Sequence, residues 1–151
     1  METNGLNASE KLIQGIVQTF AQYQQASMAE MVKEAMKRKA EGGYSSQRPP
    51  VGYSTTERRG LFKINRQGQQ LRRAMKSLAE EEISLEIFKM EVFYILNSQH
   101  RGFRSASDMK KLVSNPYYAG KISYCGNMYK GLHEPLITVA EQDKLIEIFS
   151  N

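Results

Sequence analysis

Cysteine, tryptophan and histidine are scarce in this chain of 151 residues, which contains one cysteine, no tryptophan and two histidines. The single cysteine, Cys125, excludes an internal disulfide and a multi-cysteine zinc site, and it favours a reducing compartment. With no activating partner nearby in the sequence, its thiol is predicted to be at least half-buried. His100 and His133 have no metal-ligand spacing with Cys125, so we expect no metal site. Both histidines lie in polar turns, where hydrogen bonding to a loop is commoner than acid–base catalysis.

Long apolar runs are also absent. No stretch approaches the roughly 20 apolar residues of a membrane-spanning helix, and residues 1–5 lack the features of a signal peptide. We therefore predict a cytoplasmic protein without a membrane partner. The sequence has no Gly-rich phosphate loop with Lys and Ser or Thr, and no residue set offers a nucleophile together with a base. The chain by itself is predicted to be no enzyme, and to bind neither a cofactor nor a small-molecule substrate.

Positive charge is concentrated in one segment. The whole chain carries a net charge of +5, whereas residues 42–76 alone carry +7, because eight basic residues are opposed there only by Glu57. A solvated, flexible basic linker would have this composition. However, six of the eight are arginines, and guanidinium groups match the geometry of phosphates. The segment therefore favours binding to a polyanion over a passive linker.

A long helix is predicted from Ser9, as its cap, to about Ala40. Its apolar residues recur at helical spacing, and Gly42-Gly43 provides the stop. Such a helix would be about 45 Å long, which is more than a small neighbouring domain can cover. Its apolar stripe is thus predicted to contact another subunit or domain, which makes self-association possible; folding back onto its own domain is the alternative. The stripe consists of Leu12, Ile13, Ile16, Val17, Phe20, Met28, Met31, Val32 and Ala35.

The middle of the chain is predicted to change from a linker to a helical domain. Residues 42–60 are rich in Gly, Ser and Pro, and Tyr44 and Tyr53 within them are expected to dock on the following domain. A short strand is predicted at 61–64, followed by a helix over 67–79. Ser84 is predicted to cap a third helix whose apolar side forms the centre of the core. That side consists of Leu85, Ile87, Phe88, Val92, Ile95 and Leu96.

A helix-turn-helix-like pair and a β-hairpin are predicted in the last third. The polar turn 97–104 and the capping sequence Ser105–Asp108 lead into a short helix over 106–113. The period then changes to two around Gly126-Asn127, which predicts a hairpin. Thr138–Glu141 is a capping box that opens a final amphipathic helix. The expected fold class is α+β and mainly helical.

Three motifs, in this order, resemble those of a known family: Pro50–Tyr53, Asn115–Gly120 and His133–Ile137. With the long helix before them and Leu96-Asn97 between them, the set resembles the recombinase domain of large serine recombinases, the phage integrases and transposon recombinases that cut and rejoin DNA. The family's catalytic serine domain, zinc ribbon and coiled coil have no counterpart in this sequence.

The resemblance implies a domain organisation and a cellular setting. Residues 1–41 would be a long helix linking to an absent catalytic domain, residues 42–60 a basic linker, and residues 61–151 the recombinase DNA-binding domain. The chain would then be a DNA-binding fragment that recognises attachment half-sites. It would be encoded by a bacterium or phage and associated with the nucleoid.

Double-stranded DNA is the partner that the resemblance implies. The helix end and the linker would contact phosphates and the minor groove, and the short helix would enter the major groove. The implied backbone and minor-groove contacts are Lys37, Arg38, Lys39, Arg48, Arg58 and Arg59, and the major-groove contacts are Arg104, Ser107, Lys110 and Lys111. Two alternatives stay open from the residues alone: a stand-alone helix-turn-helix regulator that dimerises through the long helix, and a protein-interaction module.

Overall fold

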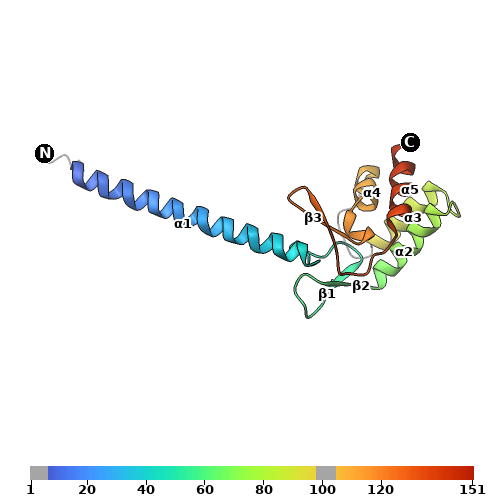
Figure 1. Cartoon of the computed structure of the whole chain (residues 1–151). Coiled ribbons are helices and arrows are strands. Elements are labelled where there is room, and N and C mark those ends of the chain that lie inside the picture. The colour runs from blue at the N-terminus through green and yellow to red at the C-terminus, as the bar shows by residue number, and fades with distance from the viewer. Residues whose placement is uncertain (1–6, 98–104) are drawn as a thin grey trace. The chain divides into compact units, whose positions relative to one another are not determined.

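The computed structural model describes residues 7–97 and 105–151 (Figure 1). The chain divides into two compact units, residues 1–38 and residues 39–151. The first unit contains most of helix α1 (Ala8–Glu41), and the second contains two separate two-stranded sheets and four further α-helices among the described residues. The predicted fold class, mainly helical α+β with a long first helix, is confirmed.

Helix α1 spans the predicted range without interruption. Its cap is Asn7 rather than the predicted Ser9: Asn7 Oδ1 accepts from the Glu10 N–H at 2.8 Å, and Glu10 Oε2 accepts from the Asn7 N–H at 2.9 Å. At the other end Gly43, with φ at 86°, turns the chain away. In the described part of the chain, no helix is both long enough and apolar enough to cross a membrane.

Part of the segment predicted as a linker is built into the second unit. Strand β1 (Tyr53–Thr55) pairs antiparallel with β2 (Phe62–Ile64), so that Tyr53 lies opposite Ile64. Tyr53 is only 4% exposed, and its predicted docking is confirmed. Residues 39–60 thus belong to the same compact unit as the helices that follow.

Helices α2 (Arg66–Ala79) and α3 (Leu85–Asn97) form as predicted. Asn65 caps α2 by accepting from the Gly68 N–H at 2.9 Å, and Ser84 caps α3 by accepting from the Ile87 N–H at 3.3 Å. The expectation that Ile87 faces the core is wrong, because its side chain is 47% exposed. Apolar residues occupy more than one face of α3: Met90 is also exposed, at 72%.

The C-terminal third contains α4 (Ala106–Val113), a 3₁₀ turn η1 (Pro116–Ala119), the hairpin of β3 (Lys121–Tyr124) with β4 (Asn127–Lys130), and α5 (Val139–Ser150). Both predicted helices and the hairpin are present. The predicted turn between α3 and α4 lies outside the described residues.

The hairpin turn differs by one residue from the prediction. Tyr124 pairs with Asn127, so Cys125 and Gly126 are the two turn residues. Both have positive φ angles, 48° and 79°, which a turn of type I′ requires. Cys125 is exposed at the tip of the hairpin, and the expectation of a half-buried thiol is wrong.

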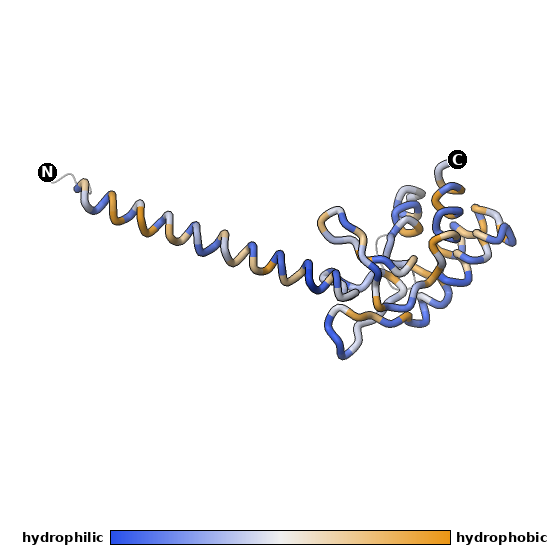
Figure 2. The backbone as a smooth tube through the Cα atoms, viewed as in Figure 1, coloured by the Kyte–Doolittle hydropathy of each residue, from blue (hydrophilic) through white to orange (hydrophobic). Residues whose placement is uncertain are grey.

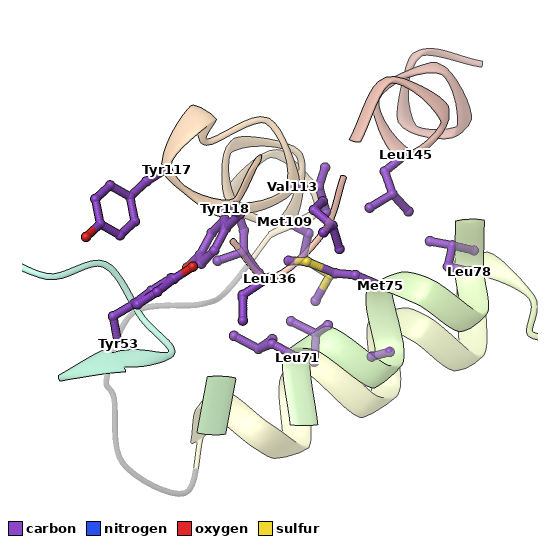
Figure 3. Packing of buried hydrophobic residues seen from close by; sticks show 14 of the residues in the cluster. Tyr53, Leu71, Met75, Leu78, Met109, Val113, Tyr117, Tyr118, Leu136 and Leu145 are labelled. Atoms are coloured by element: carbon purple, nitrogen blue, oxygen red, sulfur yellow. The ribbon is translucent and has the colours of Figure 1, made fainter. Parts of the chain in front are cut away.

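The core of the second unit lies among α2, α3, α4 and α5 (Figure 3). Phe88, Val92 and Leu96 of α3 are fully buried, as predicted. From α2, Leu71 and Met75 are fully buried; Val113 of α4 and Leu145 of α5 are equally inaccessible. Tyr118 of η1 is 1% exposed and donates its hydroxyl to the Val51 carbonyl at 2.6 Å. This bond ties the segment before β1 to the helical core.

Gly68 provides a test of this packing. A Cβ at Gly68 would collide with the carbonyl group of Gly52, whose carbon would be 2.9 Å away. We expect Gly68→Ala to destabilise the second unit by about 1–3 kcal/mol, as overpacking does, and to lower its melting temperature by circular dichroism.

The matched control is Gly15→Ala. A Cβ at Gly15, in the middle of α1, would meet nothing within 4 Å. This change should leave the unfolding of the second unit unaltered and raise the helix propensity of α1 by up to about 1 kcal/mol. Equal melting temperatures for Gly68→Ala and the unmodified chain would contradict the packing described here.

Candidate nucleic-acid interface

Lys39 and the loop between β1 and β2 lie next to each other in the second unit. The Lys39 Cε atom lies 2.8 Å from the position that a Cβ on Gly60 would occupy. The Ser45 N–H donates to the Gly60 carbonyl at 2.8 Å, which joins the segment after α1 to the same loop. Arg58 and Arg59 precede Gly60, and both are exposed. Three predicted contact residues therefore share one region of the surface.

The β1–β2 loop has its own internal hydrogen bonds. Thr56 Oγ1 lies 2.7 Å from the Leu61 carbonyl and 3.1 Å from the Arg58 carbonyl, and the Leu61 N–H donates to the Arg58 carbonyl at 3.2 Å. The backbone that presents Arg58 and Arg59 is thus held in a defined turn. A positively charged loop with a fixed backbone loses less conformational entropy when it binds an anion.

Arg48 follows the segment that Ser45 attaches to this loop, and its side chain is exposed. A hollow of about 260 Å³ separates this segment from the turn after α4, with Ser46 and Gln47 on one side and Asn115 and Pro116 on the other. The segment before Arg48 and the turn after α4 thus line the same hollow. Lys37 and Arg38 belong to the first unit, where both are exposed.

Helix α4 presents the predicted major-groove residues on one face. Met109, Leu112 and Val113 are buried, whereas Ser107, Lys110 and Lys111 are exposed, as the helical period requires. Arg104 lies outside the described residues.

Both ends of α4 are fixed by hydrogen bonds. The Ser105 N–H donates to Asp108 Oδ2 at 3.2 Å. From α5, Gln142 Nε2 donates to the carbonyls of Val113 at 3.0 Å and Asn115 at 2.7 Å. The exposed face is consequently held on a helix with little freedom to move against the core.

Arg72, one of the eight basic residues of the charged segment, has a structural role. Its Nη2 atom lies 2.9 Å from Glu134 Oε1 and 2.9 Å from the Pro135 carbonyl, and its Nε donates to the Leu136 carbonyl at 3.2 Å. This guanidinium fastens α2 to the segment before α5. Part of the positive charge of residues 42–76 is therefore engaged within the fold and is not available to bind a polyanion.

The three motifs that carried the resemblance converge in one buried cluster. Tyr117 and His133 stack with ring centroids 3.6 Å apart and planes 4° apart, and Tyr53 meets Tyr117 edge-on at 4.9 Å. Tyr53 also donates its hydroxyl to the Glu134 carbonyl at 2.6 Å. Figure 3 shows Tyr118 between Tyr53 and Leu136. These motif residues hold the fold together and are too buried to contact DNA.

Burial sets the protonation of this cluster. The pKa of His133 is lowered, first by desolvation, against the opposing effect of its hydrogen bond to the Tyr117 carbonyl. Because that carbonyl accepts at 2.6 Å, His133 Nε2 carries the proton and Nδ1 is the bare nitrogen. His133 Nδ1 is buried and finds no hydrogen-bond partner among residues 7–97 and 105–151. Burial likewise raises the pKa of the Tyr53 and Tyr118 hydroxyls, which therefore remain donors.

No metal site is found among the residues that the structure describes. Residues 7–97 and 105–151 contain no group of three or more His, Cys, Asp or Glu side chains placed to hold an ion. What the surface offers is positive charge on ordered loops and one polar helix face, an arrangement suited to binding a polyanion.

In its fold the chain is similar to large serine recombinases, which confirms the resemblance carried by the sequence motifs. One similar solved structure is the crystal structure of a large serine recombinase (LSR)–DNA complex, which is 25% identical, with a TM-score of 0.58 over 80% of this chain and 39% of that one. A second concerns the sequence requirements of the Listeria innocua prophage attP site. It is also 25% identical, with a TM-score of 0.57 over 80% of this chain and 51% of that one.

This chain therefore spans only 39% and 51% of the lengths of these two structures. No protein-family model matches the sequence, and no curated protein matches it.

The buried His133 predicts a stability that depends on pH. Its lowered pKa means that the unfolded chain binds more protons than the folded one from about pH 6.5 down to the folded pKa. We expect the free energy of unfolding, measured with urea, to be highest above pH 6.5 and to fall as the pH drops through this window.

The His133→Phe variant keeps an aromatic ring in the stack but has no titrating nitrogen. It should be less stable at pH 7.5, because the bond to the Tyr117 carbonyl is lost. Its stability should also change less than that of the unmodified chain between pH 7.5 and pH 5.5. Equal pH dependence in both proteins would show that His133 is not the group responsible.

Proposed function

We propose that this chain is the DNA-binding region of a large serine recombinase and recognises half-sites of an attachment site in double-stranded DNA. The observation that carries the proposal is the similarity to the LSR–DNA complex over 80% of this chain. The position of Lys39 beside the loop of Arg58 and Arg59 supports it from the chain's own residues. The chain would supply site recognition, and the recombination chemistry would belong to the complete recombinase.

Affinity and specificity would come from different parts of the second unit. Lys39, Arg58 and Arg59 would contact phosphates, which releases counterions and contributes equally on every sequence. Arg48 would enter the minor groove, where narrow A·T-rich stretches concentrate negative potential. Helix α4 would direct Ser107 to base edges in the major groove, because its polar first turn is exposed and its core face is anchored.

The two roles predict different effects of mutation. Arg58→Ala/Arg59→Ala should weaken binding to all duplexes by about one to two orders of magnitude at low salt and reduce the slope of log K against log salt by about 2. Ser107→Ala/Lys110→Ala should instead reduce the preference for the best site by about 1–3 kcal/mol. Fluorescence anisotropy measures both, with a duplex selected from a randomised library and its shuffled counterpart at several salt concentrations.

Arg73→Ala/Lys76→Ala is the matched control, since it removes the same charge from exposed positions on α2. It should alter affinity much less than Arg58→Ala/Arg59→Ala. If the loop and α4 variants behaved alike, the division of roles would be wrong. If the unmodified chain bound selected and shuffled duplexes equally, the chain would not be a site-recognition domain.

A regulator that dimerises through α1 is a second candidate function, and the exposed stripe of α1 favours it. Figure 2 shows apolar residues recurring along this helix. Ile16 is 61% exposed, Phe20 59% and Met31 66%. Exposed apolar surface of this extent on one helix favours association with a second helix.

Self-association is tested on the α1 stripe itself. Analytical ultracentrifugation should detect a dimer or higher species whose dissociation constant rises at least tenfold in Ile16→Asp. In contrast, Gln18→Asp, on the opposite side of the helix, should leave the constant nearly unchanged. A stable dimer that binds a symmetric duplex would favour the regulator, whereas a monomer that binds half-sites would favour the recombinase fragment.

A further inference from the structure

Two lysines are placed directly opposite each other in the hairpin of β3 and β4. The register pairs Lys121 with Lys130, so their Cβ atoms are neighbours on the same face of the sheet. Like charges in this position destabilise an antiparallel pair. Among the residues that the structure describes, neither lysine has an acidic partner within ion-pair distance. The hairpin therefore carries an electrostatic penalty that a bound anion would remove.

The outer face of the hairpin is defined by the pleat. Ile122 is 5% exposed, and Tyr124 and Tyr129 pack against the core cluster, so these residues form the inner face. Successive residues alternate between faces, which places the pairs Lys121–Lys130 and Ser123–Met128 on the other side. The outer face thus offers two ammonium groups, one hydroxyl and one thioether. Met128 is 58% exposed.

The hairpin continues the basic region already described. The Leu132 N–H, just after β4, donates to the Gly43 carbonyl at 3.0 Å. The Lys130 carbonyl would lie 3.1 Å from a Cβ on Gly43. Gly43 lies in the turn that the Tyr44 N–H closes by donating to the Lys39 carbonyl, and Lys39 contacts the β1–β2 loop at Gly60. Lys39 on one side of this turn and Lys130 on the other are therefore basic residues of the same compact unit.

The shape of the outer face agrees with an extended ligand. A hollow of about 430 Å³ borders it, lined by both lysines and Met128 together with Tyr129, Gly131 and Pro135. Ser123 lines the neighbouring hollow of about 260 Å³, to which Lys121 and Met128 also contribute. A nucleic-acid backbone alternates an anionic phosphate with a sugar that has apolar edges. The outer face has the matching alternation, since a lysine pair is followed along the strands by the Ser123–Met128 pair.

We infer that the outer face of the β3–β4 hairpin is a second contact to the DNA backbone, in which Lys121 and Lys130 flank one phosphate. The Ser123 hydroxyl donates to a phosphate oxygen, and Met128 packs on the adjoining deoxyribose. This contact reads no sequence; it fixes the position of the duplex on the domain. The inference rests on the proposed DNA-binding function and adds residues that the sequence motifs do not indicate.

The test uses two hairpin variants of the full chain. The plot of log K against log salt falls with a negative slope, and loss of one phosphate contact makes it less steep by about 1. This corresponds to roughly eightfold weaker binding at 0.1 M salt. Lys121→Ala/Lys130→Ala should show this loss equally on selected and shuffled duplexes. The control Lys89→Ala/Lys144→Ala removes the same charge from α3 and α5, at the other side of the second unit (Figure 1), and should bind nearly as the unmodified chain does.

The second variant, Lys121→Glu, separates binding from folding. It replaces the opposed like charges by a Lys–Glu pair, so the melting temperature without DNA should stay equal or rise while the affinity for DNA falls more than tenfold. A lower melting temperature together with weaker binding would assign the lysines a structural role and overturn the inference.

The measurements distinguish the inference from the function on which it rests. If the unmodified chain binds the selected duplex and both hairpin variants bind it equally well, only the hairpin contact is wrong. If the unmodified chain binds no duplex at all, the proposed function itself fails. A loss confined to the selected duplex would make the hairpin a base-reading element, which also contradicts the inference.

Discussion

The stack of Tyr117 on His133 is the interaction on which the second unit depends. The two rings lie 3.6 Å apart, and the imidazole donates to the Tyr117 carbonyl. A Cβ on Gly131 would collide with the imidazole ring, so the chain can bring this histidine into place only with glycine there. Around the stack, Tyr53 joins β1 to the segment before α5. Segments that are about 80 residues apart in sequence are held together by these aromatic groups.

The positions of the proposed DNA contacts follow from this arrangement. The loop carrying Arg58 and Arg59 extends from the sheet that begins with Tyr53. The β3–β4 hairpin starts directly after η1, which contains Tyr117. Arg72 adds a second connection between α2 and the segment before α5. Each of these short segments thus carries first a residue of the rigid, buried aromatic cluster and then exposed basic residues. The basic residues are available to a ligand.

Much of the fold could be predicted from the sequence because its helices have strong local signals. The period of apolar residues located α2, and capping sequences located the starts of α4 and α5, to within a residue or two. Strand β1 was missed, since three residues within a stretch rich in Gly, Ser and Pro have no period to detect. The inward placement of Ile87 was wrong because α3 has apolar residues on more than one face, and spacing cannot rank them.

The site was harder to predict than the fold. Charge density singled out residues 42–76, but whether an arginine is exposed or bonded to a distant carbonyl is a tertiary property, as Arg72 shows. The lysine pair of the hairpin needed the register, which a turn displaced by one residue changes.

The burial of the aromatic motifs has a consequence for how binding specificity can change. The aromatic residues of the motifs lie inside the second unit, whereas Ser107, Lys110 and Lys111 project from the outside of α4. Substitutions on that outer face leave the packing of Tyr117, Tyr118 and His133 intact. With α4 as the base-reading element of the proposed function, the domain could acquire a new target without refolding, and a designed library restricted to one face of this short helix would be the route to retargeting it.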